Sequence, residues 1–127
     1  SRDVARARRM RAPRSARPAL RKAEQALAQG RRREFADALR EALAAYFGNR
    51  LNLPTGAVTP DVVMSRLEQS ALSRDWTTRT RNLLTFCDQE RYGQGAAALS
   101  EGDRTLLTEQ LDALRGILKA CEKVHLQ

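Results

Sequence analysis

The residues that could do chemistry begin with a cysteine and the one histidine of the chain, Cys121 and His125, four positions apart. On a helix this spacing places both side chains on one face, as a thiolate–imidazole pair or as two ligands of a metal ion. A zinc site needs four ligands, and Cys87 would add only one more. The alternative is that Cys121 packs in the core while His125 caps the end of a helix. We expect this second arrangement, with no metal site and no thiol chemistry.

Carboxylates give no clearer indication of catalysis. Glu34, Asp37 and Glu41 recur at helical spacing, which predicts one polar helix face where they balance nearby arginines. Gly93 and Gly95 lack the lysine and the helix start that follow the glycines of a phosphate-binding loop. We therefore expect a protein that is not an enzyme, with no cofactor and no catalytic residue.

Glu90, Arg91 and Tyr92 form the most distinctive polar–aromatic cluster in the chain. One interpretation is structural, because such residues can end a helix. The other is functional, in which the three residues are partly exposed and contact a partner. The sequence favours the structural interpretation, and these three residues are the candidate contacts if a protein partner binds here.

Arginines crowd the start of the chain. Residues 1–33 carry 12 basic and two acidic side chains, whereas the remaining residues carry 11 basic and 13 acidic ones, for a net charge of +8. Because like charges repel and prolines interrupt the run, we expect residues 1–16 to form a basic arm that is disordered or only transiently helical. A helical domain would then occupy residues 17–127. The candidate contacts of the arm with a membrane surface or a polyanion are Arg2, Arg6, Arg8, Arg9, Arg11, Arg14 and Arg17.

Four interpretations of this arm remain open. Arginines neutralise the phosphates of nucleic acid, lie against anionic lipid, or follow a membrane helix and fix its orientation. The fourth interpretation is a solvated tail that has no ligand. Proteins that bind nucleic acid usually add aromatic side chains for stacking, and no aromatic residue precedes Phe35. The arm therefore favours a membrane-proximal position over nucleic-acid binding.

The elements that position these residues are predicted to be helices. The apolar residues are mostly leucine and alanine, which favour helix, and no run alternates in the manner of a strand. Two apolar stripes at helical spacing are Phe35, Leu39, Leu43, Phe47 and Leu51, and Leu107, Leu111, Leu114, Leu118, Cys121 and His125. We predict a single all-α bundle of about five helices. The first runs from Pro18 to Gln29, and the second follows Arg33 and ends at about residues 49–52. The third is short and begins at Thr59–Asp61, the fourth runs from about Ser73 to Tyr92, and the last runs from about Ser100 to His125.

Turn and capping residues separate these helices. Gly30 predicts a left-handed turn between the first two helices, which form an αα-hairpin of tetratricopeptide-like size. Thr59, Ser73 and Ser100 are predicted N-caps of the next three helices. Residues 94–99 are small and polar enough for a loop.

Length and composition indicate the number of domains, the state of the cysteines and the absence of membrane-spanning stretches. A chain of 127 residues with 42% hydrophobic residues suits one domain with one core. Two cysteines are too few for a secreted disulfide scaffold, so we expect both to be reduced and buried. No apolar stretch is long enough to span a membrane or to form a signal-peptide core, so we expect a soluble fragment. A membrane segment can still precede it in a longer parent protein.

Several stretches resemble the C-terminal region of the BatD family, the oxygen-tolerance (aerotolerance) proteins of bacteria. The similar segments are RREFADALREALAAYFGNRLNLPTGAVTPDVVMSRLEQSALS, then LLTFCDQERYG, then a closing leucine-rich helix. They share an aromatic–small helix, a leucine–proline turn, a threonine-capped short helix, and a helix end with cysteine, an acidic residue, arginine and an aromatic residue. The resemblance covers most of the chain, from about Pro18 to Val124.

The resemblance implies a function as well as a fold. Proteins of this family have an exported N-terminal region rich in β-domains, one transmembrane helix, and a short helical domain on the cytoplasmic side of the bacterial inner membrane. The arginines would then be the juxtamembrane segment. Family partners are MoxR-type ATPases and membrane proteins with von Willebrand factor A domains. We expect a non-catalytic docking domain in an envelope stress response, and the alternative is nucleic-acid or anionic-lipid binding through the arginine-rich arm.

Overall fold

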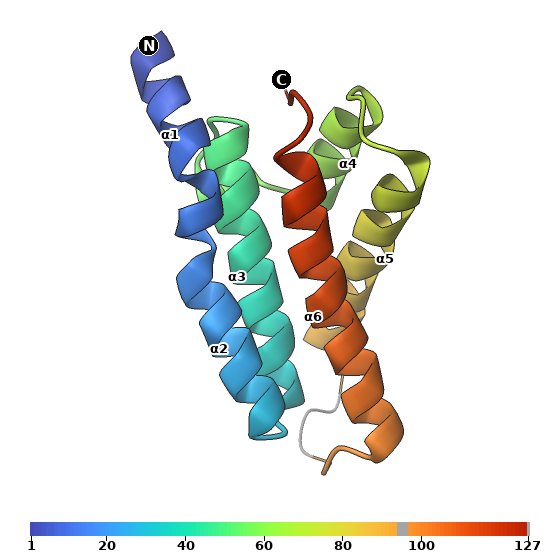
Figure 1. Ribbon diagram of the computed structural model, residues 1–127. Coiled ribbons are helices and arrows are strands. Elements are labelled where there is room, and N and C mark those ends of the chain that lie inside the picture. Colours follow the sequence, from blue (N-terminus) through green and yellow to red (C-terminus); the bar gives the residue numbers. More distant parts are fainter. Residues whose placement is uncertain (94–96, 127) are drawn as a thin grey trace.

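The computed structural model describes residues 1–93 and 97–126, and these residues contain helices but no strand (Figure 1). The five predicted helices are all present, and a further helix precedes them. The bounds are α1 Arg2–Ser15, α2 Arg17–Ala28, α3 Arg32–Arg50, α4 Pro60–Glu68, α5 Arg74–Arg91 and α6 Glu101–Cys121, with a 3₁₀ turn, η1, at Thr55–Ala57. The all-helical bundle is confirmed. None of the helices in these described ranges combines the length and the apolar character needed to cross a membrane.

Helix α3 is the central element of the bundle. α1 and α2 follow one another along one side of α3, while α5 and α6 pack against it from the other side (Figure 1). The N-terminus and the end of α6 lie at one end of the bundle. The α2–α3 turn and the start of α6 lie at the opposite end. The start of α1 and the α2–α3 turn therefore lie at opposite ends of the bundle.

The α2–α3 hairpin forms as predicted. Gly30 adopts a φ of +70°, the left-handed conformation that glycine reaches without steric penalty. Ala23 and Ala26 on α2 are buried, as are Ala36 and Ala38 on α3. Because alanine side chains are small, α2 packs closely against α3.

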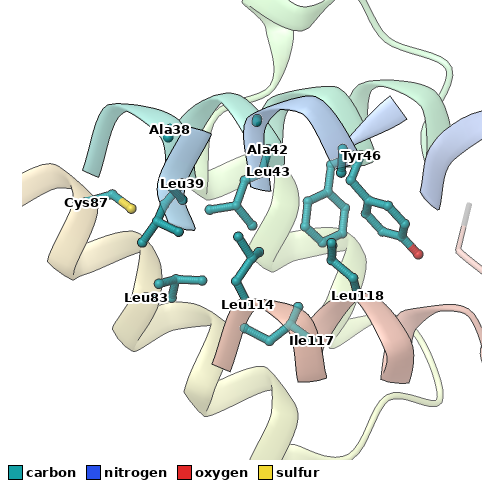
Figure 2. Packing of buried hydrophobic residues seen from close by; sticks show 14 of the residues in the cluster. Ala38, Leu39, Ala42, Leu43, Tyr46, Leu83, Cys87, Leu114, Ile117 and Leu118 are labelled. Carbon is teal, nitrogen blue, oxygen red and sulfur yellow. The ribbon is translucent and has the colours of Figure 1, made fainter. Parts of the chain in front are cut away.

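The core joins α3 to α5 and α6. The predicted stripe of α3 is buried throughout, and Figure 2 shows Leu39 and Leu43 facing Leu83 of α5 and Leu114 of α6. Each of these four leucines is at most 3% exposed. Burial of such side chains contributes roughly 1.5–3 kcal/mol each relative to exposure, so this cluster is the main source of stability.

Capping side chains begin the later helices where they were predicted. The hydroxyls of Thr59 and Ser73 accept hydrogen bonds from backbone amides in the first turns of α4 and α5. At α6, the Ser100 hydroxyl accepts from the Asp103 amide at 3.0 Å, and the Asp103 carboxylate accepts from the Ser100 amide at 2.9 Å. This reciprocal pair is the predicted capping box. In the predicted loop, residues 97–99 are non-helical, and residues 94–96 lie outside the described residues.

The expectation of a disordered arm at residues 1–16 is wrong, because this segment forms α1 and packs on α3. Ala12 and Ala16 are completely buried, whereas most of the arginines lie on the outer face, where water screens their repulsion. The prolines do not abolish the helix. Pro13 lies in the last turn of α1 and Pro18 in the first turn of α2, so they divide one helical run at Ala16.

Candidate interaction surface

Cys121 and His125 do not share a helix face. α6 ends at Cys121, and His125 lies in the exposed segment beyond it, while Leu126 is the residue that turns back into the core. The predicted inclusion of His125 in the apolar stripe is therefore wrong, because the helix stops one turn too early. Burial raises the pKa of the Cys121 thiol to about 11, so this cysteine is protonated at neutral pH.

Cys87 is the cysteine closest to a surface groove. It contributes to the wall of a hollow of about 570 Å³ between α3, α4 and α5, but its own side chain is only 1% exposed. Burial raises the pKa of this thiol to about 12, although the nearby guanidinium of Arg40 opposes the shift. A protonated, buried thiol packs as a small hydrophobic group. Within the described ranges, no group of three or more histidine, cysteine or acidic residues is arranged to hold a metal ion.

The three carboxylates on the polar face of α3 pair with basic side chains, two of them with arginines as predicted and the third with a lysine of α2. Glu34 pairs with Arg31, Asp37 with Arg40, and Glu41 with Lys22. All three acidic side chains are more than half exposed in these pairs. Ion pairs in this setting contribute little to stability and leave the carboxylates in water.

Glu90 has a structural role, as part of an ion-pair cluster with Arg32 and Asp103 that we call the frame. The Arg32 guanidinium donates from Nε and Nη2 to the two carboxylate oxygens of Glu90, at 2.9 and 2.8 Å, and from Nη1 to Asp103 at 3.1 Å. The Glu90 side chain is only 15% exposed. The hydrogen bond to Glu90 is the main reason why the pKa of Arg32 rises above its ordinary value. These contacts join the start of α3, the end of α5 and the start of α6.

Arg91 and Tyr92 project outward from this frame. Both side chains are exposed, and Tyr92 is 81% exposed, the highest value among the large hydrophobic residues of the described chain. Tyr92 caps the end of α5, and the next residue is held in place because Arg33 donates to the Gly93 carbonyl at 2.7 Å. Of the three predicted partner contacts, Arg91 and Tyr92 thus have the accessibility that a contact requires.

The predicted basic contacts divide in the same way. Arg8 is half-buried and donates to Asn49, Asn52 and the Leu53 carbonyl, so it attaches α1 to the end of α3. The others are exposed and take part in none of the ion pairs between described residues. We call them the arginine face: Arg2, Arg6, Arg9, Arg11, Arg14 and Arg17.

Arg50 has a structural role that the sequence analysis missed. It is 7% exposed and donates to the Cys121 carbonyl at 2.8 Å, to the Val124 carbonyl at 2.9 Å and to the Tyr46 hydroxyl at 2.6 Å. Carbonyls at a helix C-terminus need such donors. The available signal was its position, one turn after Tyr46 at the end of the apolar stripe of α3, where a charged residue needs buried partners.

Comparison of the chain with family models, with curated proteins and with solved structures finds no match in any of the three. What the protein does is therefore inferred from its own exposed surfaces. Two of these surfaces stand out: the Arg91–Tyr92 pair at one end of the bundle and the arginine face along α1 and α2.

Proposed function

We propose that this chain is a non-catalytic protein-interaction domain, and that Arg91 and Tyr92 are its docking contacts. The observation that carries the proposal is the 81% exposure of Tyr92 at the end of a helix held by the Arg32–Glu90 ion pair. Burying a large aromatic side chain in a partner would release the water around it. Tyrosine and arginine are also the residue types that dominate the binding energy of protein interfaces.

The local geometry favours binding because little has to be ordered when a partner arrives. Arg32 and Arg33 hold the two sides of the site, at Glu90 and at the Gly93 carbonyl. The Tyr92 ring makes no ring contact and its hydroxyl no hydrogen bond with another described residue. A side chain presented from an anchored helix end loses less entropy on binding than one in a loop without such contacts.

The resemblance to the BatD family supports the same site. Glu90, Arg91 and Tyr92 all belong to the family-like segment LLTFCDQERYG. Within it, Cys87 packs in the core and Glu90 joins three helices, so the fold accounts for these two residues. It does not account for the exposed aromatic residue that follows them. A docking role gives that residue a physical purpose.

The family also suggests the setting and the partners. In our proposal the domain lies on the cytoplasmic side of the bacterial inner membrane, and a transmembrane helix in the parent protein precedes α1. Its partners are a MoxR-type ATPase or membrane proteins with von Willebrand factor A domains, in a complex for oxygen tolerance and envelope stress. The basic residues of α1 fit this setting, because positive charge accumulates beside the cytoplasmic ends of membrane helices.

A titration with point variants tests the docking site. The 127-residue chain is titrated with the purified ATPase and with the A-domain proteins of the same bacterium, by calorimetry or biolayer interferometry. Tyr92→Ala should weaken binding at least about 30-fold, as expected for a central aromatic contact. Tyr92→Phe should keep most of the affinity, because it preserves the ring.

Arg74 provides the matched control for Arg91. Both arginines are exposed, lie at opposite ends of α5 and form none of the ion pairs between described residues. Arg91→Ala should weaken binding, whereas Arg74→Ala should leave it unchanged. If neither class of protein binds the chain, the docking function is wrong. If a partner binds and Tyr92→Ala behaves like Arg74→Ala, the proposed site is wrong.

A further inference from the structure

The arginine face has positive charge that the fold itself does not neutralise. Asp3 and Glu24 are the acidic residues of the α1–α2 segment, and Glu24 already pairs with Arg115 of α6. Arg21 extends the same exposed surface one turn beyond Arg17. Like charges at this density repel one another, so an anionic ligand that lies across several arginines at once would stabilise the surface.

The shape of this face suits an extended ligand. α1 and α2 follow one another in line along α3, with the division at Ala16 (Figure 1). From Arg2 to Arg21 the two helices cover roughly 30 Å at 1.5 Å per residue. Buried alanines attach the inner side to α3, so the exposed arginines project from the outer side and the flanks of α1 and α2, with Arg14, Arg17 and Arg21 on the outer side. A small anion would occupy only a fraction of this length.

Exposed apolar side chains on α1 indicate which of two extended anions, a nucleic acid or a lipid surface, fits this face. Met10 is 73% exposed and Val4 is 56% exposed, and both lie on α1 among the arginines. Met10 lies one turn from Arg6 and one turn from Arg14. The phosphate backbone of a nucleic acid offers nothing apolar to such a side chain. A lipid surface does, because apolar side chains of a basic helix insert below the headgroups while the guanidinium groups bind the phosphates.

We infer that the arginine face binds an anionic phospholipid surface, with Met10 inserted between the headgroups. This contact is separate from the docking site at Tyr92 and uses none of its residues. It holds α1 and α2 along the bilayer and leaves the partner site on another part of the bundle. The attraction weakens as salt screens the charges.

Vesicle binding tests this inference on the whole 127-residue chain. The probe is phosphatidylcholine vesicles with and without phosphatidylglycerol, and binding is measured by flotation. The chain should bind the vesicles that contain phosphatidylglycerol and not those of phosphatidylcholine alone. The triple variant Arg6→Gln, Arg9→Gln and Arg17→Gln should bind roughly 100-fold more weakly, since each basic residue near the surface contributes a factor of about five.

A control of equal charge separates this surface from net charge. Arg74, Lys119 and Lys123 are exposed and form none of the ion pairs between described residues, and their change to glutamine removes the same three charges. This second triple variant should retain binding within about twofold. Circular dichroism of both triple variants should match that of the unchanged chain, because glutamine favours helix about as well as arginine does.

Met10→Ala decides between lipid and nucleic acid. It should weaken vesicle binding about fivefold, in proportion to the apolar surface that no longer inserts. The inference is overturned if phosphatidylglycerol has no effect, or if the two triple variants lose binding equally. It is also overturned if duplex DNA at the same phosphate concentration binds more tightly than the vesicles do, and if Met10→Ala changes neither the affinity for DNA nor the affinity for vesicles. Failure here would leave the titration at Tyr92 unaffected, because that experiment contains no lipid.

Discussion

Arg32 and Glu90 are 58 residues apart in sequence, and the Arg32 guanidinium donates two hydrogen bonds, of 2.9 and 2.8 Å, to the Glu90 carboxylate. The pair joins α3 to α5 at the base of the proposed docking site. Arg32→Gln should lower the free energy of unfolding by about 1.5–3 kcal/mol, because it removes hydrogen bonds to charged groups that are largely shielded from water. Urea denaturation measures the loss.

Lys22→Gln is the control for this prediction. Lys22 also pairs with a glutamate, but both side chains are more than half exposed. Its substitution should change stability by less than about 0.5 kcal/mol. An equal loss in the two variants would contradict the assignment of Arg32 as a shielded structural link.

Asp103 should make the stability of the chain depend on acid pH. The hydrogen bond from the Ser100 amide, helped by Arg32, holds the pKa of Asp103 below its ordinary value of 3.8. The folded state therefore favours the ionised carboxylate. The resulting stabilisation is present above pH 3.8 and is lost as the pH falls through the lower folded-state value. Thermal melts across the acid range measure this slope.

Two variants identify the cause of that slope. Asp103→Asn should remove the contribution of this group, whereas Arg32→Gln should leave most of it, because the Ser100 amide is the larger cause. If Asp103→Asn melts with the same acid dependence as the unchanged chain, the capping box does not control that part of the profile.

Arg8 should be important for stability although it lies in a segment where the sequence predicts disorder. It donates to the Leu53 carbonyl at 2.7 Å and to the side chains of Asn49 and Asn52. We expect Arg8→Gln to cost about 1–2 kcal/mol and to speed amide hydrogen exchange in α1. The neighbouring Arg9 is exposed and forms none of these bonds, so Arg9→Gln should change stability by less than about 0.5 kcal/mol. Equal exchange rates in the two variants would show that Arg8 does not hold α1.

Gly116 is predicted to tolerate no side chain. A Cβ atom at this position would lie 2.8 Å from Cζ3 of Trp76 in α5 and would also collide with Cη2 of the same ring. Gly116→Ala should destabilise the chain by about 1–3 kcal/mol through overpacking, with a shift in tryptophan fluorescence. Gly102→Ala in the same helix is the matched control, because its nearest neighbour would be the Ser100 hydroxyl at 3.8 Å. That variant should lose no stability, and a loss as large as that of Gly116→Ala would contradict the steric explanation.

Leucines of the two main apolar stripes should contribute strongly to the free energy of unfolding. Leu39 is completely buried and Leu111 is 4% exposed. Leu39→Ala or Leu111→Ala should cost about 2–5 kcal/mol in urea denaturation. Val4→Ala, at an exposed site of α1, should cost less than about 0.5 kcal/mol. A loss of only a few tenths for Leu39→Ala would mean that α3 is not the central helix.

The predicted and observed helices agree because the signals for them are local. Gly30, Thr59 and Ser100 each act on backbone groups within four residues, so their effect can be inferred from sequence alone. The stripe of α3 has the same local character, since a helix repeats every 3.6 residues. His125 is the informative exception. It continues the spacing of α6 but lies beyond the end of the helix, which periodicity cannot detect.

The candidate sites were less predictable, because the sequence shows which charges exist and not which of them find partners. Arg8 and Arg9 are neighbours of the same type, yet one binds the end of α3 and the other faces water. Glu90 and Tyr92 belong to one cluster, yet one is part of the frame and the other is exposed. These differences depend on contacts between segments more than 40 residues apart.

The sequence by itself determined that this chain is helical, where most of its helices begin and end, and which leucines and alanines form the core. Capping residues and apolar spacing act within about one helical turn, so both can be recognised in the sequence alone. The tertiary structure alone decided that the arginine-rich start is a packed helix, that Arg32 and Arg50 bind distant segments, and that Tyr92 remains exposed. Such outcomes depend on which surfaces the folded core brings within hydrogen-bond reach of a long side chain, a distance that no local pattern encodes.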